Sequence, residues 1–434
     1  MKVAVIALGK VGLPLAVQIA SKGHLVLGAD ISRSTVDLVN SGTPPFPGEE
    51  HLEERLSELV TAGSLRATTD TETAVSESEV IVVVVPLMTD QTGIPDFTAL
   101  DNASAVIARG LQPGTLISYE TTLPVGATRT RFAPLLEEAS GLVAGRDFYL
   151  VHSPERVFSG RIFQDLRRYP KLVGGIDDES AKRGVQFYES VLDFDDRADL
   201  EKANGVWLLS SSEAAEMAKL AETTYRDVNI ALANEFAAFA EEAGIDVNEV
   251  IDSANSQPFS HIHRPGVAVG GHCIPVYPRF YLSGHPAAEL VETARRVNLA
   301  VPARAVGSIA QALGGLIGKT VLILGAAYRG GVKETAYSGV FDLVRAVSAN
   351  GGLAVVADPL FSDDELTELG LHPWSGDPID ALIVQADHAD YSDLGPEDIP
   401  GVKAVYDGRG VLDRERWESA GVTIRVIGQG VNAD

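Results

Sequence analysis

The chain has 434 residues, of which 45% are hydrophobic and 22% charged, a composition typical of a globular protein with two or three domains. Its formal net charge of −25 argues against nucleic acid as a main partner, because nucleic-acid binding needs a basic surface. The longest unbroken apolar run, at residues 80–85, is too short to span a bilayer, and we expect no signal peptide before the first strand-like segment. We therefore expect a cytoplasmic protein without a membrane partner.

The first 150 residues carry the pattern of a parallel sheet with covering helices. Residues 2–8 and 25–29 are predicted strands, and between them lie a glycine turn at 9–12 and a helix at 13–21. The β-branched run at 80–85 is typical of a parallel strand covered on both faces. Further strands of the same sheet are predicted at residues 115–119 and 148–151.

A long helix is predicted in the middle of the chain. Ser211 and Ser212 are candidate N-caps for a helix over residues 213–243, and Gly244 is a candidate stop. The pattern is alanine-rich on several faces, which suits a helix packed between domains or subunits. Residues 257–271 are rich in proline, glycine and histidine and predict an irregular loop.

A second strand–turn–helix–strand pattern begins near Lys319. A strand at 321–324 is followed by a turn at 325–327, a helix at 340–349 and a strand at 354–357 that ends at Asp358. Further strands are predicted at 381–384 and 402–406. The predicted fold class is therefore α/β, with two Rossmann-like doubly wound domains joined by a long-helix central domain.

The turn at residues 7–12 stands where a dinucleotide-binding G-x-G-x-x-G turn would stand. Its backbone N–H groups and the helix dipole suit a pyrophosphate, and Asp30 at the end of the next strand suits the adenine ribose hydroxyls. Ala7 replaces the first glycine, so a tight turn without a ligand is the alternative.

The single cysteine lies in the segment Val269-Gly270-Gly271-His272-Cys273-Ile274-Pro275-Val276. One cysteine excludes an internal disulfide and a cysteine-rich zinc site, and we expect no metal. The two glycines allow close approach of backbone and substrate, so the thiol could attack an aldehyde. The alternative is an inert, small apolar side chain, which is the usual state of a lone cysteine.

This segment resembles the active-site loop of the UDP-glucose/GDP-mannose dehydrogenase family, and its Gly-Gly-His-Cys-Ile-Pro form is most similar to the UDP-N-acetylhexosamine dehydrogenases. Other family-like segments follow in the expected order over the whole chain. They lie at residues 120–126 (ETTLPVG), 153–156 (SPER), 216–219 (EMAK), 226–231 (RDVNIA) and 407–409 (DGR).

The resemblance implies three domains and two successive NAD-dependent oxidations. It implies an NAD-binding domain at residues 1–205, a central helical domain at 206–305 with the cysteine loop and dimer contacts, and a nucleotide-sugar-binding domain at 306–434. A nucleoside-diphosphate sugar would be oxidised at C6 to the carboxylate through a thiohemiacetal and a thioester on Cys273. A homodimer or higher homo-oligomer joined through the central helix is also implied.

The resemblance also implies site residues. The expected catalytic residues are Cys273, Lys219, Glu155, Thr122 and Thr223. The expected cofactor-binding residues are Gly9, Val11, Gly12, Asp30, Arg33, Pro86 and Thr122. The expected substrate-binding residues are Glu155, Arg156, Lys219, Arg264, Gly271 and Arg329.

Three positions depart from the family pattern. Thr223 stands for an asparagine, Tyr277 for an aspartate, and Arg329 for a lysine in a Phe-Lys motif that here is Tyr328-Arg329. These departures leave alternatives open: a UDP-glucose or TDP-glucose substrate, or a catalytically weak nucleotide-sugar sensor. A 2-hydroxy acid or 6-phosphogluconate-like dehydrogenase would share the fold plan but would form one NADH and would not need Cys273.

Overall fold

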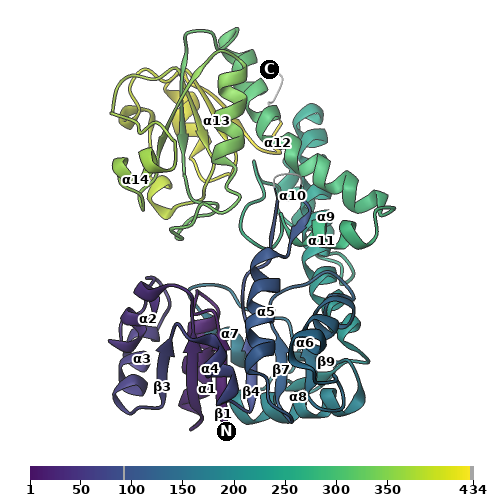
Figure 1. Cartoon of the computed structure of the whole chain (residues 1–434). Coiled ribbons are helices and arrows are strands. Elements are labelled where there is room, and N and C mark those ends of the chain that lie inside the picture. Colours follow the sequence, from purple (N-terminus) through teal and green to yellow (C-terminus); the bar gives the residue numbers. More distant parts are fainter. Residues whose placement is uncertain (91–92, 431–434) are drawn as a thin grey trace. The chain divides into compact units, whose positions relative to one another are not determined.

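The computed structural model describes residues 1–90 and 93–430, and these form two compact units (Figure 1). The first unit comprises Met1–Ala221 and Arg279–Gly284, and the second comprises Glu222–Pro278 and His285–Asp434. The division into three domains with boundaries at 205/206 and 305/306 stays a prediction.

The first unit is built on an eight-stranded sheet with the order β10-β9-β8-β7-β4-β1-β2-β3. Its valine-rich strands are buried on both faces, because helices cover the sheet on both sides. The strands are β1 (Lys2–Ile6), β2 (Leu25–Ala29), β3 (Leu65–Thr68), β4 (Val80–Val83), β7 (Leu116–Tyr119), β8 (Tyr149–His152), β9 (Lys171–Gly175) and β10 (Val206–Leu208).

Alternate residues of these strands face different helices. Val3 and Val5 of β1 join one core with apolar side chains of α1, α3, α7 and α8. The helices of the unit are α1 (Gly12–Ser21), α2 (Arg33–Asn40), α3 (Leu52–Thr61), α4 (Thr71–Ser76), α5 (Thr98–Gly110), a π-helical turn (Thr128–Phe132), α6 (Ala133–Ser140), α7 (Ile162–Arg168) and α8 (Asp178–Val191), with a short hairpin of β5 (Met88–Thr89) and β6 (Pro95–Asp96).

One pairing in this sheet is antiparallel. Strands β8 and β9 pair with His152 opposite Gly174, whereas the other strands pair in parallel with their neighbours. The first residue of β9, Lys171, therefore lies at the same edge of the sheet as the last residues of β7 and β8. A charged side chain at this position reaches the edge where a doubly wound sheet binds its ligands.

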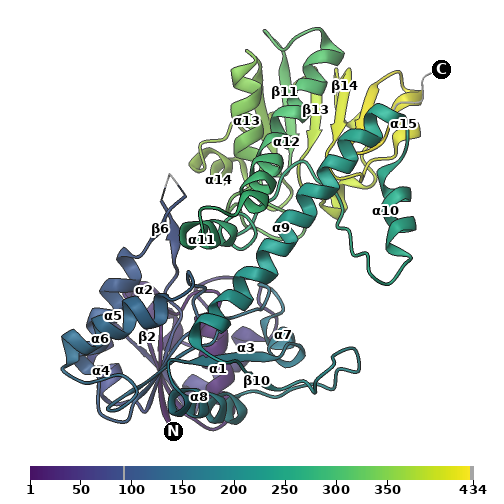
Figure 2. The ribbon, with the colours of Figure 1, turned by 90° about the vertical axis from the view of Figure 1, so that its right-hand side faces the viewer.

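The second unit contains most of a long helix, α9 (Ser212–Ala243), which Figure 2 shows as one unbroken helix. Its predicted ends are confirmed, because Ser211 Oγ accepts from Ala214 N at 3.2 Å and Gly244 has a φ of 72°. The helices that follow in the chain are α10 (Val247–Asn255), α11 (Tyr277–Gly284) and α12 (Glu289–Leu313), and most of α11 belongs to the first unit.

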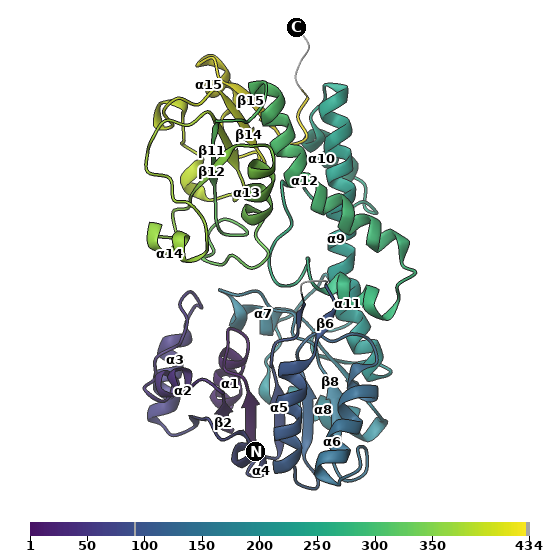
Figure 3. The same cartoon turned by 45° about the horizontal axis from the view of Figure 1, so that its top comes forward.

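The second unit also contains a five-stranded parallel sheet with the order β12-β11-β13-β14-β15 (Figure 3). Val321 and Ile323 of β11 face a core with α9, α12 and α13, and Leu322 and Leu324 face a second core that contains Trp417. The elements are β11 (Thr320–Leu324), α13 (Val340–Ala349), β12 (Leu353–Ala357), α14 (Asp363–Glu368), β13 (Ala381–Val384), β14 (Ala404–Asp407), α15 (Arg414–Ser419) and β15 (Thr423–Val426), with 3-10 turns at Ala389–Tyr391 and Pro396–Asp398.

The predicted fold class is confirmed, and three predicted strands were wrong by two residues at one end. Strand β1 ends at Ile6 rather than residue 8, because Ala7 has a φ of 76° and leaves the extended conformation. Strand β4 ends at Val83 rather than residue 85, and strand β14 begins at Ala404 rather than residue 402. Within residues 1–90 and 93–430, the structure contains no helix that combines the length and the apolar character needed to cross a membrane.

Candidate functional site

The turn after β1 is held by the carboxylate of Asp30. Leu8 N donates to Asp30 Oδ2 and Ser32 N donates to Asp30 Oδ1, both at 2.8 Å, while Ala7 N donates to the Ala29 carbonyl at 2.8 Å. The acid at the end of β2 therefore fixes the path of the turn. Ala7 adopts a left-handed conformation there, with a φ of 76°, which favours glycine.

The same turn fits a dinucleotide. A Cβ at Gly12 would run into the Ala7 carbonyl oxygen, whereas the space around Gly9 is open. Helix α1 begins at Gly12 with Val11 as its N-cap, and no side chain of the described residues caps it. Its N-terminal N–H groups and dipole therefore suit a pyrophosphate, as the sequence predicts for Gly9, Val11 and Gly12.

The other expected cofactor residues follow strands of the same sheet. Pro86 comes after β4 and Thr122 comes after β7, and Thr121 Oγ1 joins these two segments by donating to the Val85 carbonyl at 2.7 Å. Between β1 and β4 the strand order reverses, which is where such sheets bind nucleotides. Arg33 lies at the start of α2, is exposed and pairs with Asp37 at 3.2 Å.

Glu155 belongs to a buried group of charged side chains at this edge of the sheet. Lys171 Nζ donates to Glu155 Oε2 at 2.9 Å and to Glu120 Oε2 at 2.6 Å. Glu120 Oε1 accepts from the Tyr188 hydroxyl at 2.7 Å, and that hydroxyl also lies 2.7 Å from Ser118 Oγ. Lys171 therefore joins two carboxylates, of which Glu120 is fully enclosed.

The protonation of this group follows from burial and from the single ammonium. Burial raises the pKa of Glu120 to about 7, against the attraction of Lys171. Burial also opposes ionisation of Glu155, but the Lys171 ammonium and the hydrogen bonds to Glu155 hold the pKa of its carboxyl below the ordinary value. His152 is neutral, since burial and the nearby Lys171 lower the pKa of its imidazole to about 3.

Lys219 lies on the first part of α9, which a buried glutamate attaches to the loop after Thr122. Glu216 Oε1 accepts from Thr128 N at 2.8 Å and from Thr128 Oγ1 at 2.6 Å, and Oε2 accepts from Gly126 N at 2.5 Å. Burial raises the pKa of Glu216 to about 7. Lys219 is also buried, one helical turn before Thr223 and on the same face of α9.

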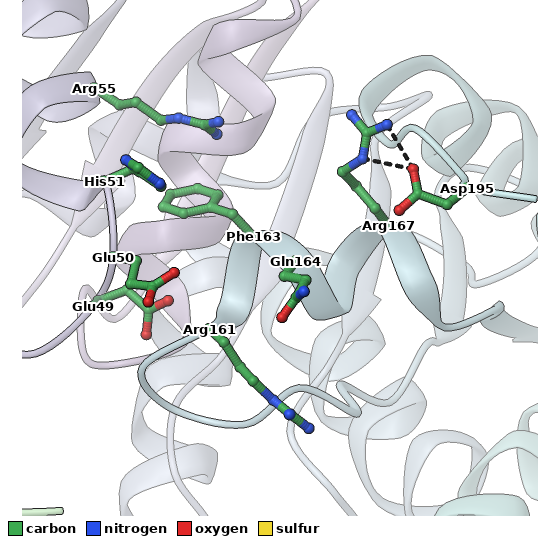
Figure 4. A pocket seen from close by; sticks show the side chains of 9 residues that line it. All are labelled: Glu49, Glu50, His51, Arg55, Arg161, Phe163, Gln164, Arg167 and Asp195. Carbon is green, nitrogen blue, oxygen red and sulfur yellow. Dashed lines mark hydrogen bonds and ion pairs between the residues drawn. The ribbon is translucent and has the colours of Figure 1, made fainter. Parts of the chain in front are cut away.

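The segment after Glu155 is attached to the loop before α3. Glu49 accepts from Gly160 N and Ile162 N, both at 2.6 Å. Figure 4 shows Glu49 and Arg161 at a pocket of about 320 Å³, where Arg55 lies over the Phe163 ring at 4.4 Å. This pocket is lined by none of the expected site residues.

In the second unit, the cysteine loop packs against the turn after β11. Gly271 N donates to the Ala336 carbonyl at 2.8 Å, and Gly271 itself has a φ of 87°. A Cβ on Gly270 would lie 2.6 Å from Tyr328 Cβ, so the two glycines permit this close packing. Cys273 is half-buried, and its carbonyl accepts from Tyr277 N at 3.0 Å at the start of α11.

The turn after β11 repeats the construction of the turn after β1. Asp358, at the end of β12, accepts from Ala326 N at 2.8 Å and from Ala327 N at 2.9 Å. Gly325 has a φ of 104° and stands where Ala7 stands in the first unit. Arg329 follows this turn and is exposed, with its Nε 3.3 Å from the Tyr328 hydroxyl.

The start of the cysteine loop is fixed by the segment at residues 407–409. Val267 N donates to the Gly408 carbonyl at 3.1 Å, and Arg409 donates to the Ala268 carbonyl at 3.3 Å. Asp407 is buried, and its carboxylate accepts from four backbone N–H groups. The donors are Arg409, Gly410, Val411 and Leu412, at 2.7 to 3.0 Å.

Two side chains that precede Cys273 in the chain have partners within the second unit. Arg264 is paired with Asp252 at 2.5 Å and also donates to the Asn248 carbonyl at 3.2 Å. His272 is exposed and lies 3.7 Å from a carboxylate oxygen of Glu334. The expected contact of Arg264 with the substrate stays a prediction.

The expected residues thus fall into two groups. The first unit holds the cofactor residues with Thr122, Glu155, Arg156 and Lys219, and the second holds Thr223, Arg264, Gly271, Cys273 and Arg329. The sequence reasoning missed the side chains that hold these residues in place. They are Glu49, Glu120, Lys171, Glu216, Asp358 and Asp407. Four of these could have been found from a charged residue beside an apolar strand: Lys171 begins its strand, Asp407 ends its strand, and Glu120 and Asp358 directly follow theirs.

Two parts of the chain match domains of a known protein family. Residues 1–192 match the NAD binding domain of the UDP-glucose/GDP-mannose dehydrogenase family, and residues 213–300 match its central domain. The chain is 34% identical to the UDP-N-acetyl-D-mannosamine dehydrogenase of Pyrococcus horikoshii, over 99% of this chain and 100% of that protein. It is 33% identical to the UDP-N-acetyl-D-mannosamine dehydrogenase of Methanocaldococcus jannaschii, over 100% of this chain and 97% of that protein.

A solved structure is similar over the same length. The UDP-D-ManNAc dehydrogenase of Pyrococcus horikoshii superposes with a TM-score of 0.88 at 33% identity, covering 99% of both chains. The resemblance inferred from the motifs and the NAD cofactor inferred from the first turn are both confirmed.

Proposed function

Because the chain belongs to the UDP-glucose/GDP-mannose dehydrogenase family and is an NAD-dependent nucleotide-sugar dehydrogenase, we propose that it oxidises the C6 hydroxyl of a UDP-N-acetylhexosamine to a carboxylate. Its relatives from Pyrococcus and Methanocaldococcus make UDP-N-acetyl-D-mannosamine the first substrate to test. The His272 form of the cysteine loop also favours an acetamido sugar over glucose.

The observation that carries this proposal is the position of Cys273. Cys273 is a half-buried residue on a loop whose two glycines pack against Tyr328, next in the chain to the exposed Arg329. A thiol that remains accessible on a fixed loop suits a nucleophile, whereas an inert cysteine is usually enclosed. Arg329 can bind a phosphate with two parallel hydrogen bonds, as the expected nucleotide-binding role requires.

The proposed chemistry proceeds through a bond to sulfur. When bound, NAD⁺ accepts a hydride in each of the two oxidations. The Cys273 sulfur bonds to C6 of the aldehyde, and after the second oxidation it holds the sugar as a thioester. Water then adds to the thioester carbon, the C–S bond breaks with its electron pair on sulfur, and the sugar carboxylate is released.

The other residues have roles that the family resemblance implies. Lys219 would stabilise negative charge on the C6 oxygen with its ammonium, and it would favour the thiolate of Cys273. Glu155 and Thr122 would handle the water and its proton. Thr223 would donate a hydrogen bond where the family has an amide, and it is buried one turn after Lys219. Arg156, Gly271 and Arg264 would contact the substrate.

We also propose a homodimer or higher homo-oligomer joined through α9, in the cytoplasm. In the second unit, one side of α9 exposes an apolar stripe that contrasts with its buried, core-facing side. The stripe consists of Tyr225, Leu232, Phe236 and Phe239, of which Phe239 is 66% exposed. Light scattering of the purified protein tests this, and a monomer at micromolar concentration would contradict it.

The function is tested by counting NADH per sugar. The purified protein is incubated with NAD⁺ and a limiting amount of UDP-N-acetyl-D-mannosamine, UDP-N-acetylglucosamine, UDP-glucose or TDP-glucose. We expect two NADH and one uronate for each acetamido sugar consumed. One NADH per substrate would contradict the four-electron reaction. Tight binding without any NADH would favour a regulatory homologue that binds nucleotide sugars without oxidising them.

A further inference from the structure

The structure contains a buried ion group behind Glu155 that none of the proposed chemical steps uses. Continuing the antiparallel register of β8 and β9 brings Lys171 opposite Glu155, and its ammonium reaches Glu155 and Glu120 at 2.9 and 2.6 Å. The Lys171 and Glu120 side chains are 4% and 0% exposed. Burying an ammonium and a carboxylate costs several kcal/mol per ion. We therefore expect these side chains to have a role beyond stabilising the fold.

The titratable groups around Lys171 and Glu155 come from several elements. Glu120 follows β7, His152 ends β8, Lys171 begins β9, and Tyr188 on α8 lies beneath Lys171, with the ammonium 4.8 Å from the centre of its ring. His152 is neutral because the pKa of its imidazole is lowered to about 3. Lys171 is therefore the one cation that these four side chains present to Glu155.

We propose that Lys171 and Glu120 are positioning residues that set the charge of Glu155 for the step in which water releases the product. Lys171 holds the Glu155 carboxylate ionised, so that it can accept a proton from water. Glu120 accepts from the same ammonium, but burial keeps Glu120 protonated in the pH range where Glu155 titrates, so Glu120 does not cancel the charge that Lys171 presents to Glu155. This inference rests on the proposed function, in which Glu155 serves the hydrolysis of the thioester.

The hydrolysis of the thioester balances in protons and electrons. Water bonds to the thioester carbon and transfers one proton to the Glu155 carboxylate, and the C–S bond breaks with its electron pair on the Cys273 sulfur. The released acid then ionises to the sugar carboxylate. A Glu155 that is already protonated cannot accept the proton, so the charge of Glu155 determines the acidic limb of the pH profile for hydrolysis.

Two substitutions should differ in their effect on that limb. Lys171→Met removes the ammonium, so we expect the acidic limb to move to higher pH by roughly one unit or more. Glu120→Gln replaces a protonated carboxyl by a neutral amide, so the limb should stay where it is. Its amide can still accept from Lys171 and donate to the Tyr188 oxygen, because the Tyr188 and Ser118 hydroxyls can reverse their direction.

The controls separate charge from structure. Lys171→Arg keeps the cation and should restore most of the wild-type profile, and Lys182→Met, on the exposed side of α8, should leave it unchanged. Damage to the fold alone would lower the rate at all pH values. An unmoved limb in Lys171→Met, or a limb in Glu120→Gln that moves as far as the limb in Lys171→Met, would overturn the proposal.

A second readout does not depend on turnover. The Glu155 carboxyl can be titrated by ¹³C NMR in the protein without substrate, with its signal assigned by its loss in Glu155→Gln. We expect the midpoint to rise in Lys171→Met and to stay unchanged in Glu120→Gln. If no nucleotide sugar yields NADH, the proposed function fails, whereas an unchanged midpoint in Lys171→Met would refute the Lys171–Glu120 inference alone.

Discussion

At the scale of single residues, carboxylates that accept backbone N–H groups fix both nucleotide-type turns. Asp30 does so after β1 and Asp358 does so after β11, and each stands at the end of the next strand. The two turns differ at one position, where the left-handed conformation belongs to Ala7 in one and to Gly325 in the other. The first turn therefore stores backbone strain that the second avoids.

Ala7→Gly should relieve this strain. The left-handed conformation destabilises alanine by about 1–2 kcal/mol, and glycine avoids this strain. Glycine also loses more backbone entropy on folding, which offsets about half of the gain. We therefore expect the free energy of unfolding to rise by about 1 kcal/mol. Urea denaturation measures the change. Ala16→Gly, within helix α1, is the matched control and should lower stability by a similar amount. A loss of stability in Ala7→Gly would refute the account of the turn.

The side chains that arrange the site were harder to predict than the residues expected to react. The motifs predict Glu155, Lys219 and Cys273 as site residues because these residues belong to short segments with a recognisable order. Lys171 and Glu120 become neighbours only because β9 runs antiparallel to β8, and an apolar run does not reveal its direction in a sheet. Strand direction is a tertiary property, since it depends on which neighbour the strand pairs with.

At the scale of elements, most strands and the long helix follow from local pattern. Helix α13 and strand β13 have their predicted bounds, and α9 ends at the predicted glycine. Helix α12 was not predicted, although it has 25 residues. Its apolar residues are interrupted by charged ones and by Pro302, and it gains its stability from packing on α13 and β14.

The attachment of α9 to the loop after Thr122 should depend on pH. The pKa of Glu216 is raised from 4.5 to about 7 in the folded protein. The folded state therefore holds the proton of Glu216 more tightly than the unfolded state does. The stability that this contributes is complete below pH 4.5 and is lost as the pH rises through 7. The amount is on the order of 3 kcal/mol. Chemical denaturation measures this effect. Glu216→Gln should lower the free energy of unfolding by less at pH 8 than at pH 5.

Glu213→Gln, one turn earlier on α9, is the control for this pH dependence. The hydrogen bond from Arg129 lowers the pKa of Glu213 to about 2, so Glu213 is ionised in both the folded and the unfolded state above pH 5. Glu213→Gln should therefore change the free energy of unfolding by the same amount at every pH between 5 and 8. A cost of Glu216→Gln that grows with pH would contradict the assignment.

At the scale of the whole molecule, two α/β units divide the expected binding tasks. NAD⁺ should protect the turn after β1 and the start of α1 in the first unit, because we expect the uncapped helix N-terminus to bind the pyrophosphate. The similar turn after β11 should remain unaffected. Hydrogen–deuterium exchange with saturating NAD⁺ measures both peptides in one experiment.

The control for cofactor binding is Gly12→Ala, whose Cβ would run into the Ala7 carbonyl oxygen. Its turn should show little protection by NAD⁺ while the second unit exchanges as in the wild type. Protection by NAD⁺ of the turn after β11 instead would show that the two turns had been assigned the wrong ligands.

The central claim is that the thiol of Cys273 bonds to the sugar. Cys273 is the single cysteine of the chain, so Cys273→Ser removes the thiol and leaves no substitute. The most direct measurement is the yield of uronate from UDP-N-acetyl-D-mannosamine and NAD⁺ by this variant, quantified by mass spectrometry beside the wild type. We predict that the variant forms no uronate under conditions in which the wild type converts the sugar completely. Undiminished uronate formation by Cys273→Ser would contradict covalent catalysis.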